Sequence, residues 1–210
     1  MTALEAAGRA LAAESARYAA MGWMRGTSGN LSVVLGRDPL RLAVTVSGRD
    51  KGELSMDDVV LVDERGEAVA DQPFPEKTPS AEAGLHARIA AVSGAGAVVH
   101  VHALAPVVAA ERWPDGVPLR DLEMLKGFGR SAHDDLVTVP VIANGQDMCA
   151  LGDAFEAGFA ADTPALIVAR HGVYVWGTDL TQARHRLECL EWLLRFTVET
   201  TLDAGGRGVR

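Results

Sequence analysis

Cysteine is scarce in this sequence, and long apolar runs are absent from it. Cys149 and Cys189 are the two cysteines in 210 residues, they form no CxxC pair, and two thiols cannot build a disulfide framework. A reducing compartment is therefore the simpler interpretation. The alanine-rich first 24 residues carry four charged side chains, unlike a signal peptide, and no stretch approaches the roughly 18 uncharged apolar residues of a membrane span. We expect a cytoplasmic protein with no membrane partner.

Sequence motifs that bind nucleotide phosphates are also missing. The chain has no GxGxxG after an expected strand and no P-loop, so nothing in it directly supports nucleotide binding. Its 28 acidic residues outnumber 20 basic ones, which gives a formal net charge of −8. A mildly acidic surface repels nucleic acid and anionic membranes, so nucleic acid is not an expected partner. A local pocket can still bind a small anion against this overall charge.

The composition is otherwise that of a globular protein, with 48% hydrophobic and 23% charged residues. The length suits one sizeable core and is too short for two comfortable domains. Hydrophobic periodicity predicts helices and strands in alternation. The helices are expected at 3–20, 79–92, 105–112, 148–159 and 179–202, and single strands at 31–35, 40–46, 95–103 and 136–142. Residues 59–69 and 165–176 are each expected to hold a strand, a turn and a second, returning strand.

This order of elements predicts a single layered α/β domain in which helices cover a central, mostly antiparallel sheet. The domain is expected to span residues 1–203, and the glycine-rich residues 204–210 are expected to form a disordered tail. Thr78 and Pro79 are expected to begin the second helix, with the threonine as N-cap and the proline at the first helical position.

Three histidines form the main candidate site. His100 and His102 are two residues apart in an expected strand, so both side chains point to the same face. Two neighbouring imidazoles in an apolar run need a partner, which is either a shared cation or separate hydrogen bonds within the core. His171 follows another apolar strand and precedes a glycine, and with the first pair it fits a three-histidine metal site. His86, four residues after Glu82, is expected to pair with that carboxylate.

Two polar loops are candidates for anion binding. Thr27-Ser28-Gly29-Asn30 precedes an expected strand, and Ser47-Gly48-Arg49-Asp50-Lys51 follows one. Such loops offer hydroxyl and backbone N–H groups, and Lys51 could add charge. The same residue types also make ordinary turns, so the loops alone leave both interpretations open.

Taken together, these motifs resemble the class II aldolase/epimerase/dehydratase family, which has the adducin-like fold. The matching stretches are the two loops, Pro79-Ser80-Ala81-Glu82, His100-Val101-His102 and His171-Gly172, and the resemblance covers roughly residues 5–200. It implies that the three histidines bind Zn²⁺ and that the substrate is a small phosphorylated sugar. The positions implied to hold the substrate phosphate are Gly29, Asn30, Ser47, Gly48 and Ser80, with Lys51 as an added candidate.

Two further stretches resemble the family's dehydratases of methionine salvage, which act on 5-methylthioribulose 1-phosphate. They are residues 123–128 (EMLKGF) and residues 170–177 (RHGVYVWG). This resemblance implies a metal-dependent hydro-lyase that forms 2,3-diketo-5-methylthiopentyl 1-phosphate. It also implies that Glu123 is the acid/base, with Glu82, the position of the aldolases' carboxylate, as the competing choice.

Two alternatives remain open from the sequence. One is a class II aldolase that cleaves a C–C bond of another ketose phosphate, and the other is a non-enzymatic interaction module of the same fold that has lost its metal. The presence of all three histidines argues against the second alternative. The resemblance also implies a homo-oligomer, a tetramer.

Overall fold

The computed structural model describes residues 2–70, 72–130, 132 and 134–205. Most helices and strands lie where the sequence predicts them, but the strand Val117–Leu119 and the 3-10 turn Glu123–Leu125 were not predicted. The strand expected at 136–142 is interrupted at Pro140 and forms two strands that belong to different sheets. The helices are α1 (Ala3–Ala20), α2 (Ala83–Ser93), α3 (Leu104–Arg112), α4 (Met148–Ala157) and α5 (Leu180–Gly205), with a 3-10 turn η1 (Glu123–Leu125). The strands are β1 (Asn30–Arg37), β2 (Leu40–Thr45), β3 (Val59–Val62), β4 (Ala97–Val101), β5 (Val117–Leu119), β6 (Val137–Val139), β7 (Val141–Ile142), β8 (Ala165–Val168) and β9 (Gly172–Gly177).

The central sheet has the strand order β3-β2-β1-β4-β9-β8-β7, so β4 lies in its middle. Its strand pairs are antiparallel apart from the parallel pair β7–β8. A second, two-stranded sheet pairs β5 with β6. The predicted α/β class with a mostly antiparallel sheet is confirmed.

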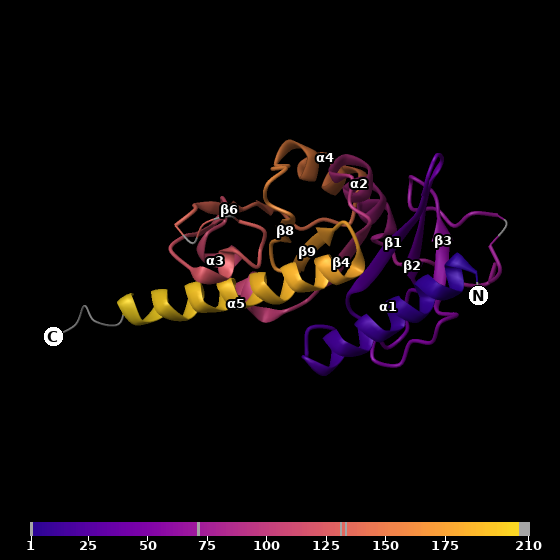
Figure 1. Cartoon of the computed structure of the whole chain (residues 1–210), viewed down its shortest axis with the longest axis horizontal. Helices are drawn as coiled ribbons and strands as arrows, with labels where there is room; N and C mark the ends of the chain where they lie inside the picture. The colour runs from indigo at the N-terminus through magenta and orange to yellow at the C-terminus, as the bar shows by residue number, and fades with distance from the viewer. Residues whose placement is uncertain (1, 71, 131, 133, 206–210) are drawn as a thin grey trace.

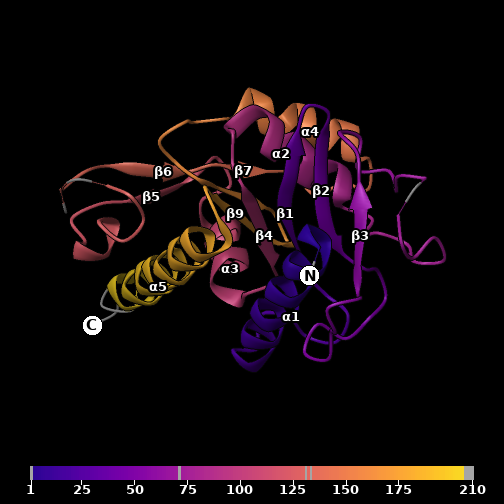
Figure 2. The same cartoon turned by 45° about the vertical axis from the view of Figure 1, so that its right-hand side comes forward.

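Helices cover both faces of the central sheet (Figures 1 and 2). Helices α1, α3 and α5 lie on one face, and α2 and α4 lie on the other. Alternation along the strands divides the core accordingly. In β4, Val99 and Val101 join the cluster that contains α5 residues such as Leu187, whereas Val98 joins the cluster that contains Leu85 of α2. The sheet is therefore buried on both faces, which explains its nearly continuous apolar strands.

Local sequence signals explain where the two longest helices begin. Thr2 and Glu5 form a capping box at α1, in which each side chain accepts a hydrogen bond from the other residue's backbone N–H. Asp179 precedes α5, and its carboxylate accepts a hydrogen bond from the Gln182 backbone N–H. Leu187 and Leu194, two turns apart on α5, are fully buried against the sheet. Replacing either with alanine would cost about 2–5 kcal/mol of unfolding free energy.

The predicted start of the second helix is wrong. Helix α2 begins at Ala83, and Pro79 instead forms an isolated antiparallel bridge with Val46. Backbone hydrogen bonds from Ser47 to Thr78 and from Ser80 to Thr45 hold this segment extended beside the end of β2. Long-range pairing therefore overrides the local N-cap signal of Thr78, and the helix starts four residues later.

Two other expectations differ in detail. The return strand within 59–69 is reduced to a single bridge between Val62 and Ala68. Helix α5 continues to Gly205, so the first two residues of the predicted tail are helical, whereas 206–210 lie outside the described residues.

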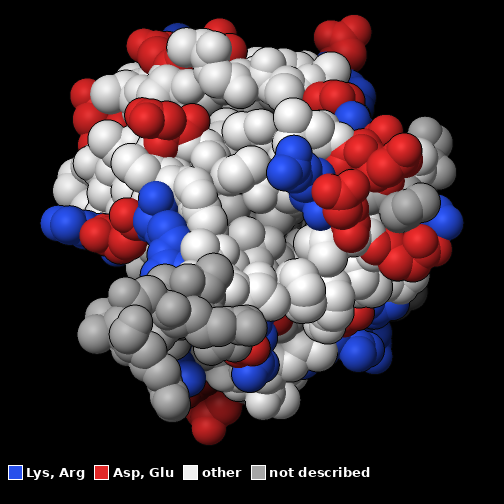
Figure 3. All heavy atoms as spheres, turned by 90° about the vertical axis from the view of Figure 1, so that its left-hand side faces the viewer, with Lys and Arg blue, Asp and Glu red and all other residues white. Residues whose placement is uncertain are grey.

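None of the helices in the described part of the chain is both long and apolar enough to cross a membrane. Figure 3 shows the face at the left of Figure 1, where acidic and basic side chains alternate around a largely uncharged centre.

Candidate metal centre and substrate cavity

The structure brings the three candidate histidines together. His100 lies within β4, His102 follows the end of that strand, and His171 lies in the turn between β8 and β9. Antiparallel pairing of β4 with β9 places Val101 opposite Val173 and so joins these segments. One ring nitrogen from each histidine lies within 4.8 Å of the others. The three ring centroids are 4.7–4.9 Å apart.

Gly172 makes this close approach possible. A Cβ atom at residue 172 would lie 2.4 Å from the Val101 carbonyl oxygen, 3.0 Å from His100 Cε1 and 3.1 Å from His102 Cδ2. The 2.4 Å separation from a backbone oxygen is shorter than real side chains show, so residue 172 must lack a Cβ for β9 to start where it does. The glycine therefore has a packing reason tied directly to the histidine cluster.

The hydrogen bond of His100 fixes which of its ring nitrogens faces the cluster. Its Nδ1 lies 3.1 Å from the Val173 carbonyl oxygen, which can only accept, so Nδ1 carries the proton. The lone pair of Nε2 then points into the cluster, 2.9 Å from His102 Nε2. Burial lowers the pKa of His100 to about 3 and also lowers the pKa of His102, which keeps both rings neutral.

These residues fit a divalent metal ion. Neutral imidazoles with convergent lone pairs are good ligands for zinc, and a backbone carbonyl on the far nitrogen is the usual way to orient such a ring. The Nε2 atom of His171 lies 3.2 Å from Glu82 Oε1, and its Nδ1 is buried without a hydrogen-bond partner among the described residues. Three ligands leave a coordination position open for substrate.

Glu82 lies directly against the histidines. Its Oε2 is 3.4 Å from His100 Nε2, and its Oε1 is 3.2 Å from His171 Nε2. The side-chain amide of Asn30 donates a hydrogen bond of 2.6 Å to Oε2. Burial alone would raise the pKa of Glu82, but the positive charge that the neighbouring histidines carry when protonated in acid and the Asn30 hydrogen bond outweigh it and lower the pKa to about 2. The group is a carboxylate at neutral pH.

A cavity of about 280 Å³ opens beside Glu82 and the histidines. Residues of both candidate anion loops line it, together with Ser80, Glu82 and two of the histidines, His102 and His171. The third histidine, His100, lies behind the cavity wall. The lining consists of Thr27, Ser28, Gly29, Asn30, Val46, Ser47, Gly48, Lys51, Ser80, Ala81, Glu82, His102, Gly145, Gln146, Met148 and His171. Cavities of this size suit small ligands.

Lys51 connects the two loops. Its side chain is 1% exposed, and its ammonium donates hydrogen bonds of 3.0 Å to the Thr27 carbonyl and 2.9 Å to the Arg49 carbonyl. Burial lowers its pKa. The lysine was a candidate for phosphate binding by charge, but the structure shows its ammonium engaged with backbone oxygens, where it fixes the spacing of the loops.

Hydroxyl groups on the cavity wall are better placed to meet a ligand. Ser80 Oγ accepts the backbone N–H of Glu82, which leaves its own O–H to donate elsewhere. Ser28 Oγ is buried without a partner among the described residues. Its sequence motif was recognised, but the residue itself was not among the predicted phosphate contacts. Asn30 lines the cavity, yet its amide is used by Glu82 and His86.

Glu123 lies apart from this cavity in the single chain. It begins η1, its side chain is 73% exposed, and Lys126 Nζ lies 2.7 Å from its carboxylate. It is not among the cavity-lining residues. The geometry therefore favours Glu82 over Glu123, the reverse of the order that the sequence resemblance implied.

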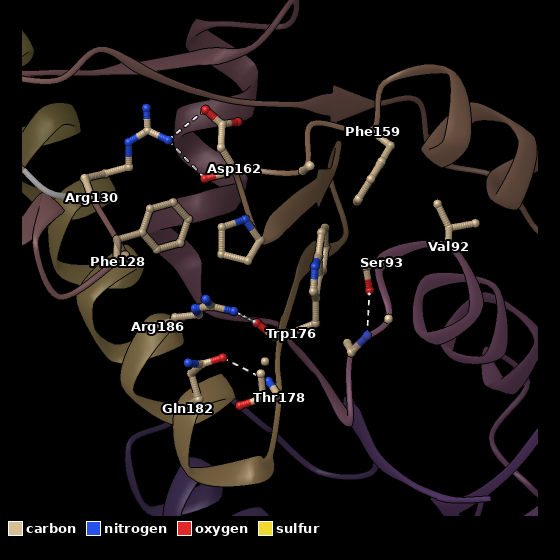
Figure 4. A pocket seen from close by; sticks show the side chains of 16 residues that line it. Val92, Ser93, Phe128, Arg130, Phe159, Asp162, Trp176, Thr178, Gln182 and Arg186 are labelled. Carbon is tan, nitrogen blue, oxygen red and sulfur yellow. Dashed lines mark hydrogen bonds and ion pairs between the residues drawn. The ribbon is translucent and has the colours of Figure 1, made fainter. Parts of the chain in front are cut away.

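A larger cavity of about 470 Å³ lies between the end of α2, β9 and α5 (Figure 4). Its cations are already engaged, since Arg130 pairs with Asp162 and Arg186 donates to the Trp176 carbonyl. None of the three candidate histidines lines it. The volume of a cavity therefore does not identify the functional site. The smaller cavity is the candidate because its lining includes Glu82 and two of the candidate histidines.

Comparison with known proteins agrees with this geometry. The family described as "Class II Aldolase and Adducin N-terminal domain" matches residues 9–198. A methylthioribulose-1-phosphate dehydratase from Bacillus cereus (strain AH187) is 35% identical over 184 residues, which cover 88% of this chain and 85% of the relative. The enzyme of the same name from Persephonella marina is 35% identical over 180 residues, covering 83% and 81%.

Solved structures show the same fold. The L-fuculose-1-phosphate aldolase from Thermus thermophilus superposes with a TM-score of 0.74 at 22% identity, covering 96% of this chain and 97% of that one. YgbL from Klebsiella pneumoniae gives a TM-score of 0.75 at 24% identity, with 100% and 95% coverage. The expectation of an enzyme of the lyase class is confirmed by the relatives. The chain belongs to the class II aldolase and adducin family.

Proposed function

We propose that this chain catalyses the zinc-dependent dehydration of 5-methylthioribulose 1-phosphate to 2,3-diketo-5-methylthiopentyl 1-phosphate in methionine salvage. The observation that carries the proposal is the placement of Glu82 within 3.4 Å of His100 and His171, in one cavity with two polar loops. The names of the sequence relatives support the choice of substrate.

A metal ion held by His100, His102 and His171 would supply Lewis acidity toward the oxygens of the substrate. The loops at 27–30 and 47–51, together with Ser80, would hold the phosphate and so fix the reacting carbons beside Glu82. The Ser80 hydroxyl, whose own O–H is free to donate, is one donor available to the phosphate. Binding energy at the phosphate is thereby used to orient a distant reaction centre.

Glu82 is the group placed to transfer the proton. Its carboxylate accepts the proton from C3, and the electron pair of that C–H bond forms the C3–C4 double bond. The C4 hydroxyl leaves as water after taking the proton from Glu82, and the enol tautomerises to the diketone. A positioned acid/base of this kind contributes about 10²–10⁴-fold to the rate.

The test is turnover of 5-methylthioribulose 1-phosphate by zinc-loaded protein, followed by ultraviolet absorbance and mass. We expect loss of one water, a decrease in kcat of about 10²–10⁴-fold in Glu82→Gln, and no decrease in the control Glu199→Gln, an exposed carboxylate on α5. Turnover that survives in Glu82→Gln and is lost in Glu123→Gln would assign the acid/base role to Glu123.

The aldolase alternative has a specific observation in its favour, because Glu82 is shared with that branch and an L-fuculose-1-phosphate aldolase superposes closely. The same assay separates the two reactions. Release of a three-carbon phosphate fragment from a ketose phosphate, with no loss of water from the methylthio sugar, would replace the dehydratase proposal with aldol cleavage.

We further propose a cytoplasmic homotetramer. Both cysteines are free thiols. Trp192 and Phe196 stack on an exposed side of α5, 44% and 41% exposed, and Leu104 of α3 is 74% exposed. Apolar surface of this kind is typical of an interface between chains. Light scattering should give four times the chain mass of 22.2 kDa, and a monomer would contradict the proposal.

A further inference from the structure

His86 lies behind the candidate site and makes contacts that its sequence position did not predict. Four residues after Glu82, it was expected to pair with that carboxylate. Instead its Nε2 lies 2.6 Å from Asn30 Oδ1, and its Nδ1 lies 2.8 Å from Ser32 Oγ. His86 and Ser32 are 0% exposed, and Asn30 is 3% exposed. Short hydrogen bonds in this dry setting are costly to break.

Donor and acceptor roles can be assigned to the three hydrogen bonds that link Glu82, Asn30, His86 and Ser32. The Asn30 amide nitrogen donates to Glu82, and its carbonyl oxygen faces His86. A carbonyl oxygen only accepts, so His86 carries its proton on Nε2. A neutral imidazole then accepts at Nδ1, and the Ser32 hydroxyl donates to it.

The backbone explains why these groups meet. Asn30 and Ser32 are two residues apart on β1 and share a face, with Asn30 opposite His100 in the sheet. Glu82 and His86 lie one helical turn apart at the start of α2. Glu82 occupies the N-cap position, yet its side chain makes no cap hydrogen bond and is turned toward the histidines instead. The Asn30 amide joins the strand to the helix.

We propose that His86 is a positioning residue, which, through the orientation of the Asn30 amide, holds the Glu82 carboxylate against the histidine cluster. If the amide rotated by half a turn, its oxygen would face the carboxylate and repel it. The His86 N–H prevents that rotation, and the Ser32 hydroxyl satisfies the other ring nitrogen. Glu82 then reaches the substrate in one orientation. The catalytic consequence rests on the proposed function, whereas the hydrogen-bond arrangement does not.

The arrangement is tested directly by NMR of ¹⁵N-histidine-labelled protein, which reports the tautomer of each ring. We expect the Nε2–H form for His86, and the same form in Ser32→Ala, because the Asn30 oxygen still requires a donor. The Nδ1–H form in the unmodified protein would overturn the proposal, because Nε2 would then accept from Asn30 and the amide oxygen would face Glu82. This measurement needs no substrate, so it stands even if the proposed reaction fails.

Kinetics test the consequence for Glu82. His86→Phe removes both hydrogen bonds at similar volume, and His86→Gln keeps an N–H donor near the position of Nε2. We expect kcat to fall roughly 10–100-fold in His86→Phe, as for other residues that orient functional groups from behind, with KM and bound zinc unchanged and most of kcat restored in His86→Gln.

The matched control is Ile89→Val, a fully buried position almost one turn further along α2. It loosens helix packing and leaves the hydrogen bonds of His86 intact. An equal decrease of kcat in Ile89→Val and His86→Phe, or a decrease in His86→Phe that His86→Gln does not relieve, would show that His86 acts only through packing and would overturn the positioning role.

Discussion

Gly172→Ala is expected to damage the metal site more than the fold. The added Cβ would lie 2.4 Å from the Val101 oxygen and 3.0–3.1 Å from atoms of His100 and His102. Because the 2.4 Å contact is with the backbone, relief needs the start of β9 to move away from β4 by about 1 Å, and overpacking of this kind costs about 1–3 kcal/mol. For a chain of this size that corresponds to a decrease in Tm of about 2–12 °C.

The same shift separates two metal ligands, and a displacement of about 1 Å at a reacting centre can reduce the rate about 10²-fold. The assay is zinc titration with a competing chelator, together with thermal unfolding and turnover. Gly145→Ala is the matched control, because Gly145 also lines the cavity and a Cβ there meets nothing within 4 Å. Wild-type zinc affinity in Gly172→Ala, with a Tm equal to that of Gly145→Ala, would refute the reasoning.

Three further predictions concern protonation, the loops and the metal. Burial lowers the pKa of His86 from 6.5 to about 4, so the unfolded chain binds its proton first, and metal-free protein should lose about 3 kcal/mol as pH falls from 6.5 through 4. Urea unfolding at several pH values should show a smaller loss in His86→Gln, and equal losses would contradict the assignment. Lys51→Met should raise KM roughly 10-fold, or about 1.4 kcal/mol, because the loops at Thr27 and Arg49 lose their common donor, and an unchanged KM would show that the loops keep their spacing without it. Chelation should abolish turnover and lower Tm, with zinc restoring both, since a ligand at 100 times its Kd stabilises by about 2.7 kcal/mol; full turnover after chelation would exclude a metal role.

Periodicity predicted most of the fold because local pattern and burial agree there. Residues 3–20 form α1 as expected, and the apolar runs around Val99 and Ile167 are central strands. The helix expected at Pro79 failed because backbone bonds to β2, distant in sequence, hold that segment extended. Such pairing leaves no local signal in the residues before Glu82.

The part of the site that consists of short sequence motifs was predictable. His100 and His102 share a strand face, His171 follows an apolar strand and precedes a glycine, and the family resemblance added Glu82. The contacts of His86 were not predictable, because helical spacing pointed to Glu82 and the true partners lie on a strand more than fifty residues earlier. The buried hydroxyl of Ser28 likewise becomes visible only when the loop is folded.

The location of β4 in the middle of the sheet has a consequence for how the site can change. Strand β4 is hydrogen-bonded on both sides, by β1 and β9, so its amides should exchange with solvent only on global unfolding. The facing wall of the cavity comes from loops, such as 145–146 and 47–48, whose amides should exchange by local opening. The candidate metal ligands are thus held by strands whose amides are expected to exchange slowly. The facing wall of the cavity is formed by loops whose amides are expected to exchange fast. Loop substitutions can therefore alter which ligand the cavity accepts while the histidines stay in place.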